Sequence, residues 1–475
     1  MKKINKHLFI PVEIFDRELG GAILLAEEAA SRGWSVILGA KQAVFQNMSR
    51  FRDTKGIFFL KSIVPGEVFK QNEIISYGHS IVSLDVEGLV PSNGESGVRL
   101  RYSSESIQKT DLLFFWGRNH YNEVFKYYPI IADKSFITGS PIIDEIKQKK
   151  ISDNSSKVSI NKKILIGTSC GFANHINGLE FSKKMTQNAY SNNVDNNQIV
   201  ELENEMDLDI FIFEYWKNII PLISHSFPDA DIVLRPHPSE NYDYWKSFVR
   251  LNRLINIRID FGTSILNELP SSDVYIHFNS TSAITAAILN IPTIMPIPTM
   301  DEVLESRITY VKNISQLARN SRELIDLISL SFEKKKFIQT SLEELYPYCE
   351  NLNDSCNNAS KAIMNSIESN FEFSDDSSII RRQKIGELIL NFLRKSKFFF
   401  LWILSSLSYH FTGKISSKLP PHNAYKSAKA KQPYINISSF KQKVQQLIKV
   451  NSQKNLQVSR ISRNIFLIKL TKYKK

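Results

Sequence analysis

The segment Asp231–Glu240, DIVLRPHPSE, carries the pattern that decides the fold. Ile232–Leu234 is a short apolar run with the length and composition of a buried strand. Pro236 and Pro238 then end the run, because proline cannot donate a hydrogen bond to a strand ladder. They also restrain the backbone on both sides of His237. The sequence therefore predicts an imidazole presented at the end of a buried strand.

A second segment has the same design. In Val274–Ala287, VYIHFNSTSAITAA, an apolar run leads into Asn279–Ser282, and helix-forming residues follow. Ser280 or Thr281 is a natural N-cap, and the N–H groups at a helix start attract anions. Ligands of open α/β sheets bind beyond the carboxyl ends of the strands. The two segments together predict a cradle for a nucleotide phosphate, with His237 on one strand and Ser280, Thr281 and Ser282 on the next.

The two motifs, RPHPSE and then HFNSTSA about 40 residues later, resemble the His-Pro and Ser/Thr motifs of bacterial sialyltransferases, polysialyltransferases and capsular Kdo transferases. The amino-acid sequences of the two motifs are most similar to those of bacterial surface carbohydrate biosynthesis proteins. The resemblance covers roughly residues 8–330. It implies an α/β fold of the GT-B type, in which two Rossmann-like domains face a cleft. It also implies a sugar donor activated by a nucleotide, CMP in these transferases.

This resemblance gives several residues an expected role. His237 and the Ser280–Ser282 helix start would stabilise the leaving phosphate. The first loop of the second domain faces the donor phosphates in GT-B enzymes, and Glu240 is placed to contact a ribose hydroxyl. The remaining residues expected to bind the nucleotide or its phosphate are Thr168, Ser169, Gly171, Arg235 and Pro238.

Two carboxylates follow another predicted strand. Ser80–Leu84 leads directly into Asp85-Val86-Glu87-Gly88, which is how a general base is often presented. In a continuing strand, Asp85 and Glu87 would point to the same face. The related transferases carry an acidic triplet here whose carboxylate takes the proton of the acceptor hydroxyl; in this chain Val86 occupies its first acidic position. Either Asp85 or Glu87 is the expected base, with Glu87 preferred, and a non-catalytic acidic turn is the alternative.

Alternating strands and helices over residues 7–295 predict two stacked parallel-sheet units. We expect an N-terminal Rossmann-like domain on the acceptor side (1–150) and a C-terminal one on the nucleotide-sugar side (151–330). Crossover helices (331–375) and a basic, partly apolar, helical extension (376–475) would follow. Within the first domain, Gly20-Gly21 permits close backbone approach, either to a substrate or simply between packed elements.

The charge of the chain is unevenly distributed. Residues 381–475 hold 21 Lys or Arg and one acid, whereas the rest holds 39 basic and 47 acidic residues. Phe398–Tyr409, FFFLWILSSLSY, is uncharged but too short to span a bilayer, so an interfacial helix with basic flanks is expected. Phe440–Val450 and Ile461–Leu470 look intermittently helical. Three cysteines without metal-ligand spacing favour a reduced, cytoplasmic setting. The basic C-terminal part predicts attachment to the inner face of the membrane.

The combined reading is a metal-independent, membrane-associated glycosyltransferase of capsule or lipopolysaccharide synthesis. It would move a sugar, from a CMP-activated ulosonic acid, to a lipid-linked glycan, with no cofactor and no nucleic-acid partner. Three alternatives remain: a CDP-glycerol- or CDP-ribitol-type phosphotransferase, which shares the RPHP strand end; a UDP-sugar 2-epimerase-like enzyme; and a non-enzymatic assembly factor at the membrane.

Overall fold

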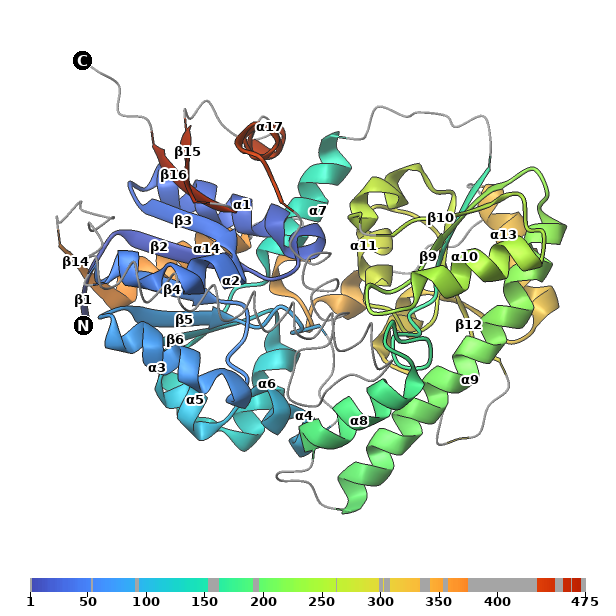
Figure 1. Ribbon diagram of the computed structural model, residues 1–475, viewed down its shortest axis with the longest axis horizontal. Coiled ribbons are helices and arrows are strands. Elements are labelled where there is room, and N and C mark those ends of the chain that lie inside the picture. The colour runs from blue at the N-terminus through green and yellow to red at the C-terminus, as the bar shows by residue number, and fades with distance from the viewer. Residues whose placement is uncertain are drawn as a thin grey trace, which may run out of the picture. The chain divides into compact units, whose positions relative to one another are not determined.

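The computed structural model divides the chain into two compact units (Figure 1). Unit 1 contains residues 1–148 and 345–475, and unit 2 contains residues 149–344. Each is built on a mainly parallel sheet, which confirms the predicted α/β class with two Rossmann-like domains. The residues described are 2–52, 54–89, 94–152, 162–190, 196–261, 263–298, 302, 308–333, 342–352, 358–374, 434–448, 456–462 and 464–470.

The sheet of unit 1 has the strand order β15-β16-β3-β2-β4-β5-β6-β7, and the strands from β15 to β6 can be followed from top to bottom in Figure 1. The six strands β2 to β7 are parallel, and β16 joins β3 antiparallel. Their bounds are β2 His7–Val12, β3 Ser35–Ala40, β4 Ile57–Leu60, β5 Ser80–Leu84, β6 Leu112–Phe115, β7 Ser135–Ile137, β15 Leu456–Ser462 and β16 Ile465–Leu470.

These strands form because each is a short apolar run buried on both faces, as parallel strands covered by helices require. Phe9 of β2 stacks on Phe58 of β4 with ring centroids 4.5 Å apart, in the middle of the core. The helices of this unit are α1 Phe15–Ser31, α2 Lys41–Gln46, α3 Val68–Ser76, α4 Gly94–Arg101, α5 Ser104–Gln108, α6 Arg118–Tyr127, α14 Ala359–Asn370 and α17 Ile437–Ile448, with α7 Pro141–Ser152 leading out of it.

The C-terminal part of the chain completes unit 1. Strand β14 (Phe371–Ser374) pairs with β1 (Lys2–Asn5), and α14 and α17 both pack on α1. Phe440 of α17 stacks on Phe466 of β16 with centroids 3.9 Å apart. The predicted helix near Phe440–Val450 is thus present. The helical expectation for Ile461–Leu470 is wrong: this segment holds β16, whose residues pair with β3 from Val36 to Gly39.

The glycine pair Gly20-Gly21 lies inside α1 and faces α7. A Cβ on Gly21 would come within 2.8 Å of the Ile142 nitrogen, and one on Gly20 would overlap Glu145. Of the two alternatives, this placement favours packing between elements over a substrate-facing loop. The glycines serve the close packing of one helix against another.

Unit 2 has the strand order β10-β9-β8-β11-β12-β13, all parallel. Counted from β8 this is the order 3-2-1-4-5-6 of a doubly wound Rossmann sheet. The strands are β8 Lys163–Gly167, β9 Asp231–Arg235, β10 Ile257–Ile259, β11 Val274–His277, β12 Thr293–Pro296 and β13 Gln316–Ala318; the helices are α8 Leu179–Tyr190, α9 Asn196–Ser226, α10 Tyr242–Leu251, α11 Ser282–Ile288 and α13 Ser321–Phe332.

Within the described residues, no helix is both long enough and apolar enough to cross a membrane. The interfacial-helix candidate Phe398–Tyr409 lies outside the described residues.

Candidate functional site

The predicted donor-side residues meet at one edge of the unit 2 sheet. Strands β9, β8 and β11 are neighbours and parallel, so the loops that follow them leave the sheet side by side. The strand order changes direction between β8 and β11, which is the switch point where doubly wound sheets bind ligands. Adjacent strands are about 4.8 Å apart, so the loops after β9 and β11 flank the β8 loop across roughly 10 Å.

Glu240 joins the loops after β8 and β9. Its Oε1 accepts hydrogen bonds from Thr168 Oγ1 at 2.7 Å, from the Cys170 nitrogen at 3.0 Å and from the His237 nitrogen at 2.7 Å. Its Oε2 accepts one from Trp245 Nε1, also at 2.7 Å. These contacts hold the backbones of the two loops in a fixed position relative to each other.

This carboxylate is fully buried, and burial raises its pKa while its hydrogen bonds, above all from Thr168 and Trp245, work in the opposite direction. With no exposed surface it is a positioning residue in this structure. The expected direct contact between Glu240 and a ribose finds no support in its placement. Thr168, whose hydroxyl is donated to Glu240, is likewise fully buried.

His237 is exposed at the carboxyl edge, as the Pro-His-Pro pattern predicts. Its Nδ1 lies 2.7 Å from Ser239 Oγ, which fixes the rotation of the ring. A Cβ on Gly171 would lie 3.1 Å from the same Nδ1, so the β8 loop passes directly beside the imidazole. Gly171 is therefore needed for close approach. Pro238 and Ser169 are exposed at the same edge.

Arg235, the last residue of β9, is engaged in a different direction. Its guanidinium forms an ion pair with Asp260 and donates to Thr263, just beyond the end of β10. Only 17% of its side chain is exposed. The structure thus gives Arg235 a role in joining β9 to β10, and its expected phosphate contact stays a prediction.

Helix α9 also holds the loop after β8 through hydrogen bonds, which the sequence did not reveal. Asp209 of α9 accepts hydrogen bonds from the nitrogens of Phe172 at 2.7 Å and Ala173 at 3.2 Å, and Trp216 Nε1 donates to the carbonyl of Thr168 at 2.9 Å. Burial raises the pKa of Asp209 to about 6, with a further contribution from nearby negative charge. The sequence of residues 178–206, which includes the start of α9, is polar and Asn-rich, and no local motif marks Asp209.

The loop after β11 begins with a buried histidine. His277 has no exposed surface, and burial lowers its pKa to about 3, so the ring is neutral. Its Nδ1 accepts from the Ser280 nitrogen at 3.4 Å, which leaves the proton on Nε2, 2.9 Å from Ser315 Oγ. Ser315 Oγ then donates to the carbonyl of Val311 at 2.9 Å. This chain of bonds holds the start of the serine-rich loop.

The predicted helix start is present but short. Helix α11 begins at Ser282 with Thr281 as N-cap residue, and the Thr281 side chain makes no capping hydrogen bond. Ser280 Oγ instead accepts from the Ser282 nitrogen at 3.3 Å. All three side chains are half-buried at the sheet edge. Asn279, just before them, has φ +48° and is held by hydrogen bonds from Thr309 to its Oδ1.

His175 and Asn174 lie at the far end of the β8 loop. His175 forms an isolated antiparallel bridge with Glu240, and its ring stacks on Phe181 at 5.2 Å. Burial lowers its pKa. Asn174 Nδ2 adds a long contact of 3.4 Å to Glu240 Oε2. Both residues thus belong to the framework around Glu240.

In unit 1 the acidic pair does not continue the strand. Strand β5 ends at Leu84, and residues 85–88 form a turn in which the Glu87 nitrogen donates to Asp85 Oδ1 at 3.0 Å. The expectation that both side chains share one strand face is therefore wrong. Asp85 is only 3% exposed and forms a two-point ion pair with Arg101, one of whose hydrogen bonds measures 2.6 Å.

Glu87 is the accessible member of the pair, with 33% of its side chain exposed. It forms an ion pair with Arg17 of α1 at 2.7 Å. The preference for Glu87 over Asp85 as base is consistent with this difference in exposure, and the role itself stays a prediction. The sequence did not identify Arg17 and Arg101, because each pairs with a carboxylate well separated from it along the chain.

A buried histidine lies under this turn. His120 Nε2 is 3.1 Å from Tyr102 Oη, and a Cβ on Gly88 would come within 2.6 Å of His120 Nδ1. Burial lowers the pKa of His120 to about 4, so the imidazole is neutral. Gly88 therefore lets the acidic turn lie flat on a neutral ring. Among the described residues, no group of three or more His, Cys, Asp or Glu side chains is placed to hold a metal ion.

No protein-family model and no curated protein sequence matches this chain. Among solved structures, it is similar to UDP-GlcNAc 2-epimerase of Methanocaldococcus jannaschii, with 14% identity, 78% of this chain and 100% of that chain covered, and a TM-score of 0.44. It is also similar to a putative UDP-N-acetylglucosamine 2-epimerase from Listeria monocytogenes, with 13% identity and a TM-score of 0.46. The match covers 77% of this chain and 96% of that chain. A third similar structure is that of accessory secretory protein 1, 2 and 3 in Streptococcus pneumoniae, with 11% identity and a TM-score of 0.36. The match covers 69% of this chain and 55% of that chain. Likeness at this level does not identify a reaction, so the assignment of function rests on the residues of this chain.

Proposed function

We propose that this chain is a nucleotide-sugar-dependent glycosyltransferase of surface polysaccharide synthesis. The observation that carries the proposal is the set of hydrogen bonds to Glu240, which joins the loops after β8 and β9. His237 remains exposed beside these loops. Burying a carboxylate costs free energy unless several well-aligned hydrogen bonds compensate for the lost water. An ordinary turn does not need such a group. Its effect is to preorganise two loops at a ligand-binding switch point.

The donor phosphates would lie over the end of β8. His237 approaches from the β9 side and the Ser280–Ser282 segment from the β11 side, a separation of roughly 10 Å across two strand spacings. Ser169 and the backbone at Gly171 line the same edge. An imidazole held by Ser239 can donate a proton or a hydrogen bond to the leaving phosphate, and preorganised donors of this kind lower a barrier most when water is excluded.

On the acceptor side we assign the general base to Glu87. Asp85 is already committed to Arg101 and holds the turn through the Glu87 nitrogen, so it is a positioning residue. The donor we propose is a CMP-activated ulosonic acid, and the acceptor is a lipid-linked glycan. The basic residues of 376–475, part of which folds into unit 1, would bring the protein to the anionic inner leaflet, where that acceptor would lie.

The test is thermal unfolding of the full-length protein with CMP, CDP, UDP, GDP and their sugar conjugates. A ligand at 100 times its Kd stabilises the folded protein by about 2.7 kcal/mol. We expect CMP or CDP to raise the Tm, and His237→Ala to remove this effect. His225→Ala, an exposed histidine in the last turn of α9, is the matched control and should leave it intact.

Product analysis then separates the alternatives. A polyol phosphotransferase adds a phosphodiester, so its product carries the extra mass of phosphate. Stabilisation by UDP alone would contradict the cytidine donor, and no stabilisation by any nucleotide would favour an assembly factor. For the transferase, Glu87→Gln should abolish sugar transfer while nucleotide stabilisation persists, because the base acts on the acceptor.

A further inference from the structure

Tyr275 of β11 carries a hydroxyl group from the core of unit 2 to the carboxyl edge of its sheet. The side chain is only 2% exposed, and its ring packs in a core cluster with Leu165 of β8 and Val233 of β9. A Cβ on Gly167 would lie 2.5 Å from the Tyr275 hydroxyl oxygen. The phenol oxygen therefore lies directly over the last residue of β8. Tyrosine is suited to such a place, because its ring is apolar and its tip is polar.

This position is the middle of the edge at which the donor site is proposed. Gly167 pairs in register with Arg235 of β9 on one side and with His277 of β11 on the other. The loop that carries His237 follows Arg235, and the loop that carries Ser280 follows His277. A side chain at position 167 would displace the phenol oxygen, so the glycine leaves the space that the hydroxyl occupies.

The Tyr275 hydroxyl contacts the serine-rich loop after β11. Burial raises the pKa of this phenol, while hydrogen bonds with Ser280 and Ser282 and the charge of Arg235 act in the opposite direction. The phenol stays protonated at neutral pH, so it can both donate and accept hydrogen bonds. The Tyr275 ring also stacks on the His277 ring, with centroids 5.3 Å apart, and His277 accepts from the Ser280 nitrogen. Two side chains of the same strand thus hold this loop.

The loop needs such support if it is to bind a phosphate. Helix α11 has only seven residues, and its N-cap residue Thr281 makes no side-chain hydrogen bond. The hydroxyls of Ser280 and Ser282 therefore have to supply donors for an anion. A serine hydroxyl rotates freely unless a neighbour fixes it, and donors that are fixed in advance lose less entropy when a ligand binds.

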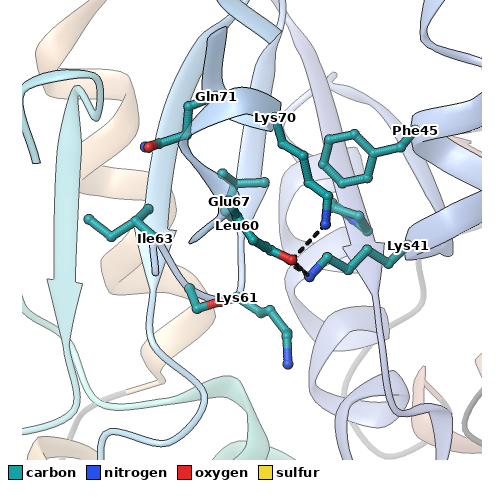
Figure 2. A pocket seen from close by; sticks show the side chains of 10 residues that line it. Lys41, Phe45, Leu60, Lys61, Ile63, Glu67, Lys70 and Gln71 are labelled. Atoms are coloured by element: carbon teal, nitrogen blue, oxygen red, sulfur yellow. Dashed lines mark hydrogen bonds and ion pairs between the residues drawn. The ribbon is translucent and has the colours of Figure 1, made fainter. Parts of the chain in front are cut away.

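The three lysines that line the unit 1 pocket beside β2 and β4 are, in contrast, neutralised by ion pairs. Glu67 lies 2.8 Å from Lys41 Nζ and 2.6 Å from Lys70 Nζ, as the dashed lines in Figure 2 show. Glu13 lies 3.0 Å from Lys61 Nζ. A phosphate would have to displace these carboxylates, whereas the hydroxyls over the end of β8 are neutral. The contrast favours the edge of unit 2 as the place of the phosphate.

We propose that Tyr275 is a positioning residue of the donor site, which orients the hydroxyls of Ser280 and Ser282 toward the phosphate of the nucleotide donor. Tyr275 acts only through these two serines. The inference rests on the function proposed above and extends it, because it places the donor phosphate over Gly167, between the serine-rich loop and His237.

CMP and UDP are the probes, titrated calorimetrically into the full-length protein at a temperature at which every variant is folded. We expect Tyr275→Phe to weaken binding of the nucleotide that the wild type takes by about tenfold, because one or two hydrogen bonds are lost. Gly167→Ala should give a similar loss, since the added Cβ displaces the hydroxyl. Tyr215→Phe is the matched control. It removes the hydroxyl of a half-buried tyrosine of α9 and should leave binding unchanged.

The serine pair separates positioning from a general loss of structure. In a Ser280→Ala/Ser282→Ala background, Tyr275→Phe should weaken binding by less than about twofold further, because the hydroxyl has no serine left to orient. A further tenfold loss in that background would overturn the proposal. Wild-type affinity in Tyr275→Phe, together with loss of binding in His237→Ala, would overturn this inference and leave the proposed function standing. A wild type that binds neither nucleotide would overturn both.

Discussion

The hydroxyl of Thr168 donates to the carboxylate of Glu240 at 2.7 Å, across 72 residues of chain. The same carboxylate accepts from Trp245 on its other oxygen. All of the groups that form hydrogen bonds with this side chain are donors, so the carboxylate acts only as an acceptor.

Glu240→Gln replaces one acceptor oxygen by an NH₂ group that must face a donor. We expect a loss of about 1–3 kcal/mol in the free energy of unfolding, the range for a buried polar group left without its partner. Urea denaturation followed by tryptophan fluorescence measures it. Glu214→Gln, an exposed acid of α9, is the control and should change stability by less than about 0.5 kcal/mol. An equal effect of both variants would remove the special role of Glu240.

The raised pKa of Asp209 predicts how the stability of the protein depends on pH. Its pKa is raised from 3.8 to about 6, so the folded state holds this proton more tightly than the unfolded state. The resulting stabilisation is complete below pH 3.8 and is lost as the pH rises through 6. Asp209→Asn keeps an acceptor for the two backbone N–H groups and has no charge to bury.

We therefore expect Asp209→Asn to be more stable than the wild type at pH 8, on the order of 1–2 kcal/mol after allowance for the partial exposure of the group. The difference should shrink toward pH 4. Denaturant midpoints at pH 4, 6 and 8 measure it. A difference that does not vary with pH would show that the proton at Asp209 is not the cause.

The sequence predicted the strand ends and which loops carry the polar groups, because apolar runs ended by proline or by small polar residues are local signals. It could not predict the side-chain contacts that hold these loops in place. Asp209 and Arg101 contact residues distant in the chain, and nothing in their own neighbourhoods marks them. The strand at Ile465–Leu470 was missed for another reason: its short apolar run, IFLIKL, is a strand signal, but the basic composition around it favoured a tail.

The C-terminal strand gives the next prediction. Phe466 of β16 is 1% exposed and stacks on Phe440, while its strand pairs with β3. Phe466→Ala should lower the free energy of unfolding of unit 1 by about 3–5 kcal/mol, as large-to-small changes in cores do. Tyr434→Ala, half exposed in the same region, is the control. A Phe466→Ala protein with unchanged stability would mean that β16 contributes little to the fold.

Glu13 gives the last prediction. Burial alone would raise its pKa, but the charges and hydrogen bonds of Lys61 and Lys41 outweigh burial and lower the pKa from 4.5 to about 2. A depressed pKa stabilises the folded state above pH 4.5, and this contribution is lost as the pH falls toward 2. Glu13→Gln should therefore destabilise the protein by about 1–2 kcal/mol at pH 7, discounted for its partial exposure, and by progressively less as the pH approaches 2.

The control for Glu13 is Glu105→Gln, whose side chain is 62% exposed beside Lys109 and should have little effect at any pH. Thermal unfolding between pH 2.5 and 7 measures both variants. A Glu13→Gln penalty that stays constant over this range would assign the loss to packing. A penalty that fades with acid would show that Glu13 stabilises the fold through its charge, by holding Lys41 and Lys61 in place.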